Sequence, residues 1–174
     1  MIIESKEVMY NQPQRGEINK TMANTYTKIY LHIVFSVKGR QSLIHKNWKE
    51  DLHKYICGIV NGKAQKVYAI GGVADHIHIL VSIKPNIALS DLVRDIKANS
   101  SKWIDEKGFT NGKFQWQEGF GAFSYAQSQL DTIIAYINNQ EQHHHKKTFK
   151  DEYLEFLQKF NVEYEDKYLF EWID

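Results

Sequence analysis

The segment 75–83, Asp-His-Ile-His-Ile-Leu-Val-Ser-Ile, constrains the fold of this chain more than any other. From Ile77 onward every second residue is a branched apolar one, which is typical of a half-buried strand. Side chains two residues apart on a strand point to the same face. His76 and His78 therefore project side by side from the face opposite the isoleucines. Two adjacent imidazoles suit the binding of a metal ion, and a pair of exposed histidines on a sheet face is the alternative.

Length and composition limit the class of protein. The 174 residues, 43% of them hydrophobic, are enough for one domain with a substantial core. Cys57 is the single cysteine, which excludes a disulfide framework and a cysteine-rich zinc site. No apolar run reaches the ~18 residues that a membrane span needs, and the N-terminus lacks the apolar core of a signal peptide. We therefore expect a cytoplasmic protein with no membrane association.

Charge is distributed unevenly along the chain although its net value is only +1. Residues 28–102 contain twelve Lys or Arg against five Asp or Glu, whereas residues 150–174 contain three against eight. A basic body with an acidic tail favours a polyanionic partner. A solvated mosaic of charges is the simpler alternative.

The hydropathy pattern predicts strands and helices in the order β-α-β-β-α-β with helices appended. The strands are expected at 26–37, 64–70, 75–83 and 114–125, and the helices at 48–62, 89–104, 128–142 and 151–160. Asn61-Gly62 would end the first helix with a residue able to adopt a left-handed conformation. This order indicates an α+β, ferredoxin-like (RRM-like) antiparallel sheet with two helices on one face and the other face open. The histidine pair would lie on a central strand, facing the open side or a second copy of the chain.

Three regions are expected along the chain. Residues 1–21 are polar and show no periodicity, which predicts a disordered N-terminal extension. Residues 22–160 form the folded domain. Residues 161–174 form an acidic C-terminal tail.

A second group of reactive residues lies on the predicted helix 128–142. Tyr136 and Gln140 are one turn apart and so share a helix face. A free phenol with a pKa near ~10 is a poor nucleophile, but beside a metal-bound phosphate it can attack phosphorus. Gln140 offers a neutral carbonyl oxygen, which suits Mg²⁺ or Mn²⁺ beside two imidazoles. A partly buried tyrosine next to a surface glutamine is the structural alternative.

Two other patterns compete with this assignment. Tyr125 and Gln129 have the same spacing, but Tyr125 lies at a strand end, so the pair would straddle a turn. The run His143-His144-His145 could also bind metal. Three consecutive helical residues point in three directions, however, so we interpret this run as a solvated helix end.

Four ordered blocks resemble the single-tyrosine HUH transposases of the insertion sequence 200/605 type. The blocks are Tyr26–Lys38, Asp75–His78, Trp116–Ser124 and Tyr136–His144. The resemblance covers about residues 22–160. It implies a homodimeric enzyme that binds subterminal hairpins of a mobile element and cuts and rejoins single-stranded DNA through a 5′-phosphotyrosine.

The resemblance also implies residue roles. His76, His78 and Gln140 would bind a divalent metal, Mg²⁺ or Mn²⁺, and Tyr136 would be the catalytic nucleophile. Tyr136 could serve the histidines of its own chain or those of the partner.

Contacts to DNA and to a second copy are predicted from the helix 89–104 and from the strands. Arg94, Lys97 and Lys102 skirt the apolar stripe of that helix and are expected to contact DNA phosphates. A sheet of this size leaves an edge strand that can pair with a copy of itself. We expect the aromatic-rich strands 26–37 and 114–125 to do so.

Two other classes of function remain open from the sequence. One is a non-catalytic module that binds single-stranded nucleic-acid hairpins on an RRM-like sheet, with Tyr30, Tyr68 and Trp116 as stacking platforms. The other is a structural or metal-sequestering dimer. A domesticated relative that acts on chromosomal hairpin repeats would share the chemistry of a transposase, and the sequence does not separate the two.

Overall fold

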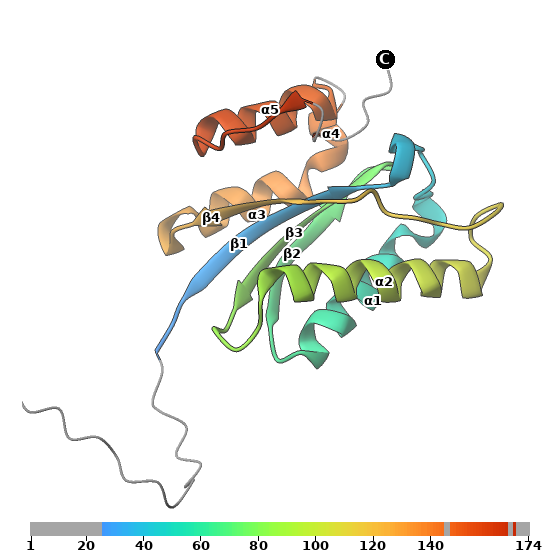
Figure 1. Ribbon diagram of the computed structural model, residues 1–174, viewed down its shortest axis with the longest axis horizontal. Helices are drawn as coiled ribbons and strands as arrows, with labels where there is room; N and C mark the ends of the chain where they lie inside the picture. Colours follow the sequence, from blue (N-terminus) through green and yellow to red (C-terminus); the bar gives the residue numbers. More distant parts are fainter. Residues whose placement is uncertain (1–25, 145–146, 167–168, 170–174) are drawn as a thin grey trace, which may run out of the picture.

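Figure 1 shows the computed structural model, which describes residues 26–144, 147–166 and 169. The predicted extension 1–21 lies outside the described residues, as does half of the predicted tail 161–174. The strands are β1 (Ile29–Ser36), β2 (Lys66–Gly72), β3 (His76–Ile83) and β4 (Gly121–Tyr125). The helices are α1 (Lys46–Gly62), α2 (Leu89–Lys107), α3 (Leu130–Asn138), α4 (Gln140–His144) and α5 (Phe149–Lys159), with short 3-10 turns η1 (Lys38–Arg40) and η2 (Gln127–Gln129).

The four strands form one antiparallel sheet in the order β2-β3-β1-β4. β1 and β2 are joined through α1 and are separated in the sheet by β3, which is the split βαβ arrangement. The α+β, ferredoxin-like prediction is confirmed. The register sets His76 opposite Ser36 and His78 opposite Val34 of β1.

One face of the sheet packs on α1 and α2. Alternate residues of β1 and β3 point to this side, and their apolar side chains meet the helical stripes of α1 and α2. The buried members of this core include Ile33, Phe35, Ile77, Ile79, Val81, Leu52, Ile56, Leu92 and Ile96. This core contains the isoleucines of the segment 75–83, as the alternation predicts.

The other face is covered by α3, α4 and α5, so the prediction of an open face is wrong. Figure 1 shows these helices on the side of the sheet opposite α1 and α2. Their apolar residues form a second core with the remaining residues of the strands, including Tyr30, Val34, Leu80, Phe123, Ile133, Ile137, Phe149, Tyr153 and Phe156. The appended helices bury their own apolar faces in this way. None of the described helices is long and apolar enough to cross a membrane.

The burial of aromatic side chains and the strand order correct two further predictions. Tyr30 and Trp116 are buried, at 4% and 8% exposure, so neither can serve as an open stacking platform, and Tyr68 is half-buried. β1 lies inside the sheet between β3 and β4, so the strand 26–37 has no free edge for a second copy. The edge strands are β2 and β4.

Three element boundaries differ from the sequence prediction. α1 includes Gly62, and the left-handed residue after it is Ala64, with φ 57°. Residues 114–120 are irregular apart from the bridge between Val37 and Trp116, so only the end of the predicted strand 114–125 is regular. The predicted helix 128–142 is interrupted at Asn139, so that Tyr136 lies in the last turn of α3 while Gln140 begins α4.

Gly71 allows α3 to lie close against strand β2. A Cβ atom at this position would come within 2.2 Å of the carbonyl oxygen of Ile137. Because that oxygen belongs to the backbone of α3, the clash cannot be relieved by a side-chain rotation. The absence of a side chain at Gly71 therefore sets the distance between the sheet and the helix that carries Tyr136.

We expect Gly71→Ala to lower the free energy of unfolding by about 1–3 kcal/mol, because the methyl group overpacks this contact. Urea unfolding followed by circular dichroism measures the change. Gly58→Ala on α1 is the matched control, since a Cβ there meets nothing within 4 Å. The control should be neutral or slightly stabilising. Equal stability of both variants would show that α3 does not depend on this close approach.

Candidate metal centre and nucleophile

His76 and His78 lie side by side on β3, as the alternation predicts, but both are completely buried. Their ring centroids are 5.0 Å apart. β3 is a central strand, and α4 and α5 cover the face of the sheet that carries the two rings. The pair is therefore an interior group and not an exposed one.

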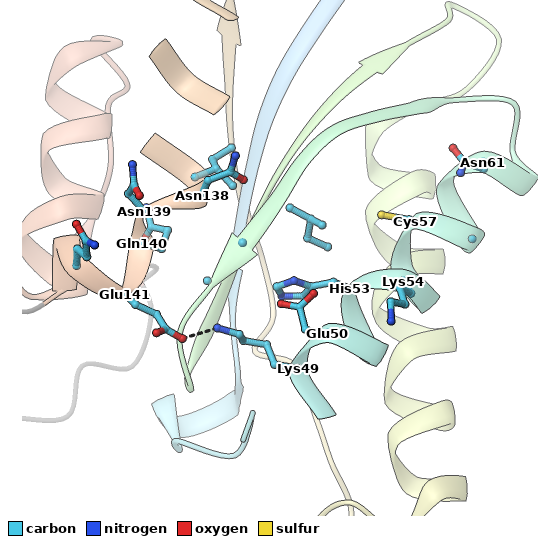
Figure 2. Close-up of a pocket in the computed structure, with 16 residues that line it drawn as sticks. Lys49, Glu50, His53, Lys54, Cys57, Asn61, Asn138, Asn139, Gln140 and Glu141 are labelled. Carbon is cyan, nitrogen blue, oxygen red and sulfur yellow. Dashed lines mark hydrogen bonds and ion pairs between the residues drawn. The ribbon is translucent and has the colours of Figure 1, made fainter. Parts of the chain in front are cut away.

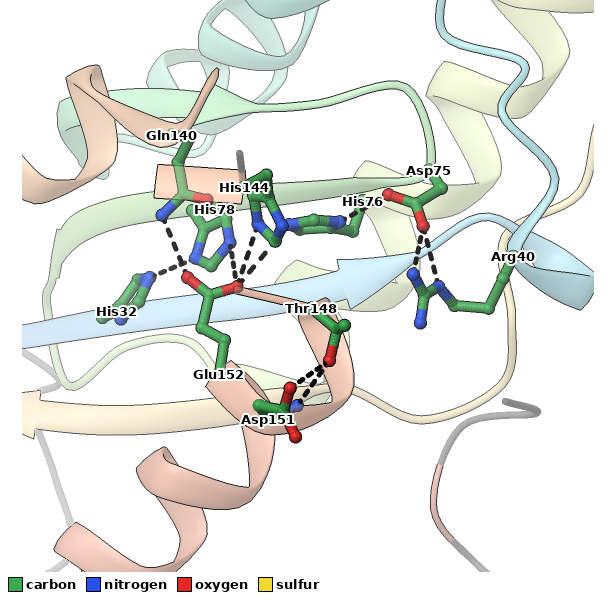
Figure 3. Close-up of polar contacts among 10 residues, drawn as sticks. All are labelled: His32, Arg40, Asp75, His76, His78, Gln140, His144, Thr148, Asp151 and Glu152. Carbon is green, nitrogen blue, oxygen red and sulfur yellow. Dashed lines mark hydrogen bonds and ion pairs between the residues drawn. The ribbon is translucent and has the colours of Figure 1, made fainter. Parts of the chain in front are cut away.

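His144 of α4 and Glu152 of α5 join the pair. The Nε2 atoms of His76, His78 and His144 lie 3.8, 3.7 and 3.1 Å from Oε2 of Glu152. The ligand atoms of these four residues lie within 4.8 Å of one another, as Figure 3 illustrates. The four residues form what we call the His₃Glu cluster.

Sequence reasoning missed half of this cluster. The interpretation of the run 143–145 as a solvated helix end is wrong for His144, whose side chain is only 14% exposed. Glu152 carried a usable signal, because it falls on the apolar stripe of α5 together with Phe149, Tyr153 and Phe156. An acidic residue at a core-facing helix position is unusual enough to mark a site.

A second layer of hydrogen bonds orients the strand histidines. Nδ1 of His76 lies 2.7 Å from Oδ1 of Asp75, and Arg40 donates from Nε to the other oxygen of Asp75 at 2.8 Å. Nδ1 of His78 lies 2.9 Å from Nε2 of His32, a buried residue of β1. Metal-binding histidines usually hold their second nitrogen in this manner. In both rings the Nε2 atom is the one directed at the His₃Glu cluster.

Burial shifts the pKa values of the cluster and its neighbours. Burial lowers the pKa of His32 to about 3 and also lowers that of His76. It raises the pKa of Glu152 to about 8, with Asp75 and Glu155 adding to the effect. For Asp75, burial by itself would raise the pKa of the carboxyl group. The hydrogen bonds and charges of His76 and Arg40 outweigh burial and lower this pKa to about 2. The imidazoles of His32 and His76 are therefore neutral near pH 7, and the neutral form is the one that binds metal.

Gln140 and Tyr136 both approach the His₃Glu cluster. Nε2 of Gln140 donates to Oε1 of Glu152 at 3.1 Å, and the Gln140 side chain is 1% exposed. The Tyr136 ring is half-buried, and its centroid lies 6.0 Å from that of His78 in the same chain. The structure thus brings together all four residues predicted from the strand and the helix.

The competing tyrosine has a different environment. Tyr125 ends β4 and is buried, and burial raises the pKa of its hydroxyl to about 12. The centroid of its ring lies 6.1 Å from that of the His32 ring. The Tyr125 ring is therefore adjacent to His32, which lies outside the His₃Glu cluster. The Tyr136 ring is adjacent to His78, which is a member of the cluster.

The predicted DNA contacts lie apart from this cluster, on α2 across the sheet. Arg94 pairs with Asp91 at 2.6 Å, and Lys102 lies 3.7 Å from Glu106. Lys97 donates to the carbonyl oxygen of Gln117 at 2.8 Å, and burial lowers its pKa to about 8. Arg94 and Lys97 line an open groove of about 970 Å³ with Lys38 and Lys113, whereas Lys102 does not.

A second groove, of about 770 Å³, lies between α1 and the junction of α3 and α4 (Figure 2). Glu141 of α4 reaches across it to Lys49 of α1 at 2.6 Å and to Lys46 at 3.2 Å. These ion pairs tie α4 to α1 at the edge strand β2. His53, which also lines the groove, is 6% exposed.

Comparison with known proteins agrees with this geometry. The family described as "Transposase IS200 like" matches residues 25–140, more than half of the chain. The chain therefore belongs to the IS200-like transposase family. The matched region contains His76, His78, Tyr136 and Gln140, and it ends before His144 and Glu152.

Individual relatives are more distant. Transposases for insertion sequence element IS200 from Salmonella typhimurium LT2 and from Salmonella typhi are each 26% identical over 98 residues, which is 56% of this chain and 64% of theirs. The chain therefore spans just under two thirds of the length of these relatives.

Two solved structures share the fold. A protein of Deinococcus radiodurans R1 described as a transposase aligns with a TM-score of 0.54 and 18% identity, over 70% of this chain and 97% of its own. A REP-associated tyrosine transposase bound to a REP hairpin aligns with a TM-score of 0.50 and 15% identity, over 69% and 71%.

The buried His53 should make stability depend on pH. Burial lowers its pKa to about 4 in the folded state, against about 6.5 when unfolded. A histidine whose pKa is lowered in the folded state contributes to the free energy of unfolding above pH 6.5. This contribution is lost as the pH falls toward 4. Between pH 7 and pH 5 we expect the chain to lose about 2 kcal/mol through His53 alone.

The measurement compares urea unfolding of the wild type and of His53→Gln at both pH values. Because the variant keeps every other histidine, the difference between the two pH dependences isolates His53. An equal loss in both proteins would show that His53 titrates normally in the folded state.

Proposed function

We propose that this chain is a transposase that cuts and rejoins single-stranded DNA through a 5′-phosphotyrosine on Tyr136, with a divalent metal held by His76, His78 and Gln140. One observation carries the proposal: the Tyr136 ring lies 6.0 Å from that of His78 within a single chain. Membership in the IS200-like transposase family supports the same function.

The donor atoms near Tyr136 fit a divalent metal. Neutral imidazoles suit divalent transition metals, and a glutamine oxygen suits Mg²⁺ or Mn²⁺. The Oε1 atom of Gln140 is buried and lies close enough to His76 to interact with it, which places it where a ligand to the same ion would be. Asp75 and His32 hold the rings of His76 and His78 in the orientation that presents Nε2.

The chemistry then divides between the metal and the protein. A bound metal would act as a Lewis acid on the scissile phosphate. The phenol oxygen of Tyr136 loses its proton and attacks phosphorus. The bond from phosphorus to the 3′ oxygen breaks, and that oxygen takes up a proton to leave as a hydroxyl. Attack by the 3′ hydroxyl of another DNA end reverses the step, so joining the strands requires no ATP.

DNA can reach the histidines only if part of their cover moves. His76 and His78 are completely buried, and Gln140 is 1% exposed. A phosphate must therefore displace the contacts that α4 and α5 make over β3. The described structure corresponds to a closed form of the site.

The basic groove beside α2 is the proposed path of the DNA. Lys38, Arg94, Lys97 and Lys113 line it. Its wall includes Gln117, whose backbone N–H donates to the carbonyl of Ser36 at 2.9 Å, and Ser36 pairs with His76 in the sheet. The groove thus lies against β1, the strand next to β3, but on the opposite face of the sheet from the His₃Glu cluster. Lys102 is proposed as an additional contact at the exposed side of α2.

The homodimer implied by the resemblance stays a prediction. α3 packs on β2 and β3 of its own chain, which favours a Tyr136 that serves the histidines of the same chain. A second copy would pair through an edge strand, β2 or β4.

The first test is formation of a covalent adduct. Incubation with Mn²⁺ and single-stranded DNA from the flanks of the gene should give a protein–DNA adduct on a denaturing gel. Tyr136→Phe should abolish the adduct while leaving hairpin binding nearly intact, because only the nucleophilic oxygen is removed.

Tyr125→Phe is the matched control and should retain the adduct. If Tyr136→Phe still forms the adduct and Tyr125→Phe does not, the nucleophile is Tyr125. An adduct that His76→Ala forms at the wild-type rate would argue against the metal site.

The second test concerns DNA binding by the groove. Phosphate contacts release counterions, so the logarithm of the affinity falls steeply with that of the salt concentration. The double variant Arg94→Ala, Lys97→Ala should lower this slope by about 2, one for each lost contact. Fluorescence anisotropy with a labelled hairpin measures the affinity at each salt concentration, from which the slope is obtained.

Lys107→Ala provides the control, because Lys107 is exposed on the same helix but lines a different surface. Its slope should equal that of the wild type. A double variant with an unchanged slope would show that the DNA lies elsewhere.

A further inference from the structure

His144 and Glu152 have no role in the proposed set of ligands, yet their ligand atoms face the same point as those of His76 and His78. Ligands bound at about 2.1 Å from one metal lie roughly 3–4.2 Å apart. The distances from Glu152 Oε2 to the three Nε2 atoms, 3.1, 3.7 and 3.8 Å, fall in this range. These three distances are those of ligands around one ion, and the four ligand atoms together lie within 4.8 Å of one another.

Separate parts of the chain hold these two residues in place. Glu141 ties α4 to α1 through Lys49, and this contact lies one helical turn before His144. Thr148 caps α5 by accepting a hydrogen bond from the backbone N–H of Asp151, the residue before Glu152. Gln140 donates to one oxygen of Glu152, which leaves the other directed at the imidazoles (Figure 3). Both side chains are therefore positioned by contacts of their own.

The donor set selects among metals. Mg²⁺ binds few imidazoles and keeps most of its water, whereas Mn²⁺ and the later divalent ions accept imidazole readily. Three imidazoles and one carboxylate in a buried site provide little room for water. The composition of the His₃Glu cluster therefore disfavours Mg²⁺.

We propose that His144 and Glu152 are metal ligands, and that with His76 and His78 they form a site that prefers a transition-metal ion such as Mn²⁺ over Mg²⁺. This inference rests on the metal site of the proposed function and extends it. Both added ligands lie beyond residue 140, where the match to the family ends. The preference would thus be supplied by the C-terminal helices α4 and α5.

The test is direct metal binding by the full chain without DNA. Calorimetry with MnCl₂ and with MgCl₂ should give an affinity for Mn²⁺ at least about tenfold higher than for Mg²⁺. Glu152→Gln and His144→Ala should each weaken Mn²⁺ binding by about tenfold or more. Gln158→Ala, at an exposed position on the same helix, is the matched control and should bind as the wild type does.

A spectroscopic count of ligands is independent of affinity. Pulsed electron paramagnetic resonance of bound Mn²⁺ should detect three imidazole nitrogens in the wild type and two in His144→Ala. Mn²⁺ should also raise the melting temperature of the wild type more than that of Glu152→Gln. If Glu152→Gln fails to fold, the partly exposed His144 carries the test by itself.

The possible outcomes separate this inference from the proposed function. Loss of Mn²⁺ binding in His76→Ala but not in His144→Ala or Glu152→Gln would leave the two-histidine site intact and overturn the inference. Equal affinity for Mg²⁺ and Mn²⁺ would overturn it as well. Mn²⁺ binding that survives in His76→Ala and His78→Ala would refute the metal site of the proposed function itself.

Discussion

The alternation of side chains along β3 is the constraint on which the rest of the structure depends. Ile77 and Ile79 point to the core beneath α1 and α2, so His76 and His78 must point to the opposite face. β3 is a central strand, paired with β1 on one side and β2 on the other. These pairings fix the face of the sheet to which the isoleucines and the histidines point. Covering the histidine face with α3, α4 and α5 then turns two strand residues into an interior polar site.

Burying such a site requires that its polar groups be satisfied from within the protein. Asp75 forms a hydrogen bond with one nitrogen of His76, and His32 forms one with a nitrogen of His78. Gln140 donates a hydrogen bond to one oxygen of Glu152. The remaining ligand atoms face one another across less than 5 Å. A divalent cation at that point would offset the cost of burying the carboxylate, whose pKa is raised to about 8 by burial. The same contacts that complete the site also close it to DNA.

The cover of the site and its chemistry are therefore linked. Removing α4 and α5 from the sheet would expose His76 and His78 to a phosphate, but it would also withdraw Gln140, His144 and Glu152. Gly71 keeps α3, with Tyr136, close to β2 through a backbone contact that does not involve the cover. Tyr136 is thus held near the strand histidines by a contact that does not depend on α4 or α5.

The sequence by itself determined the strand pair and the order of elements, and it singled out Tyr136 as the candidate nucleophile ahead of Tyr125. Periods of two and of about 3.6 residues are local properties, so they can be read without knowing what packs against them. Only the tertiary structure decided that the histidine face is covered and that His144 and Glu152 reach it. Those residues are separated from His76 by more than sixty positions. Their side chains meet it because apolar stripes on α3 and α5 pack on the sheet, and no local pattern encodes that contact.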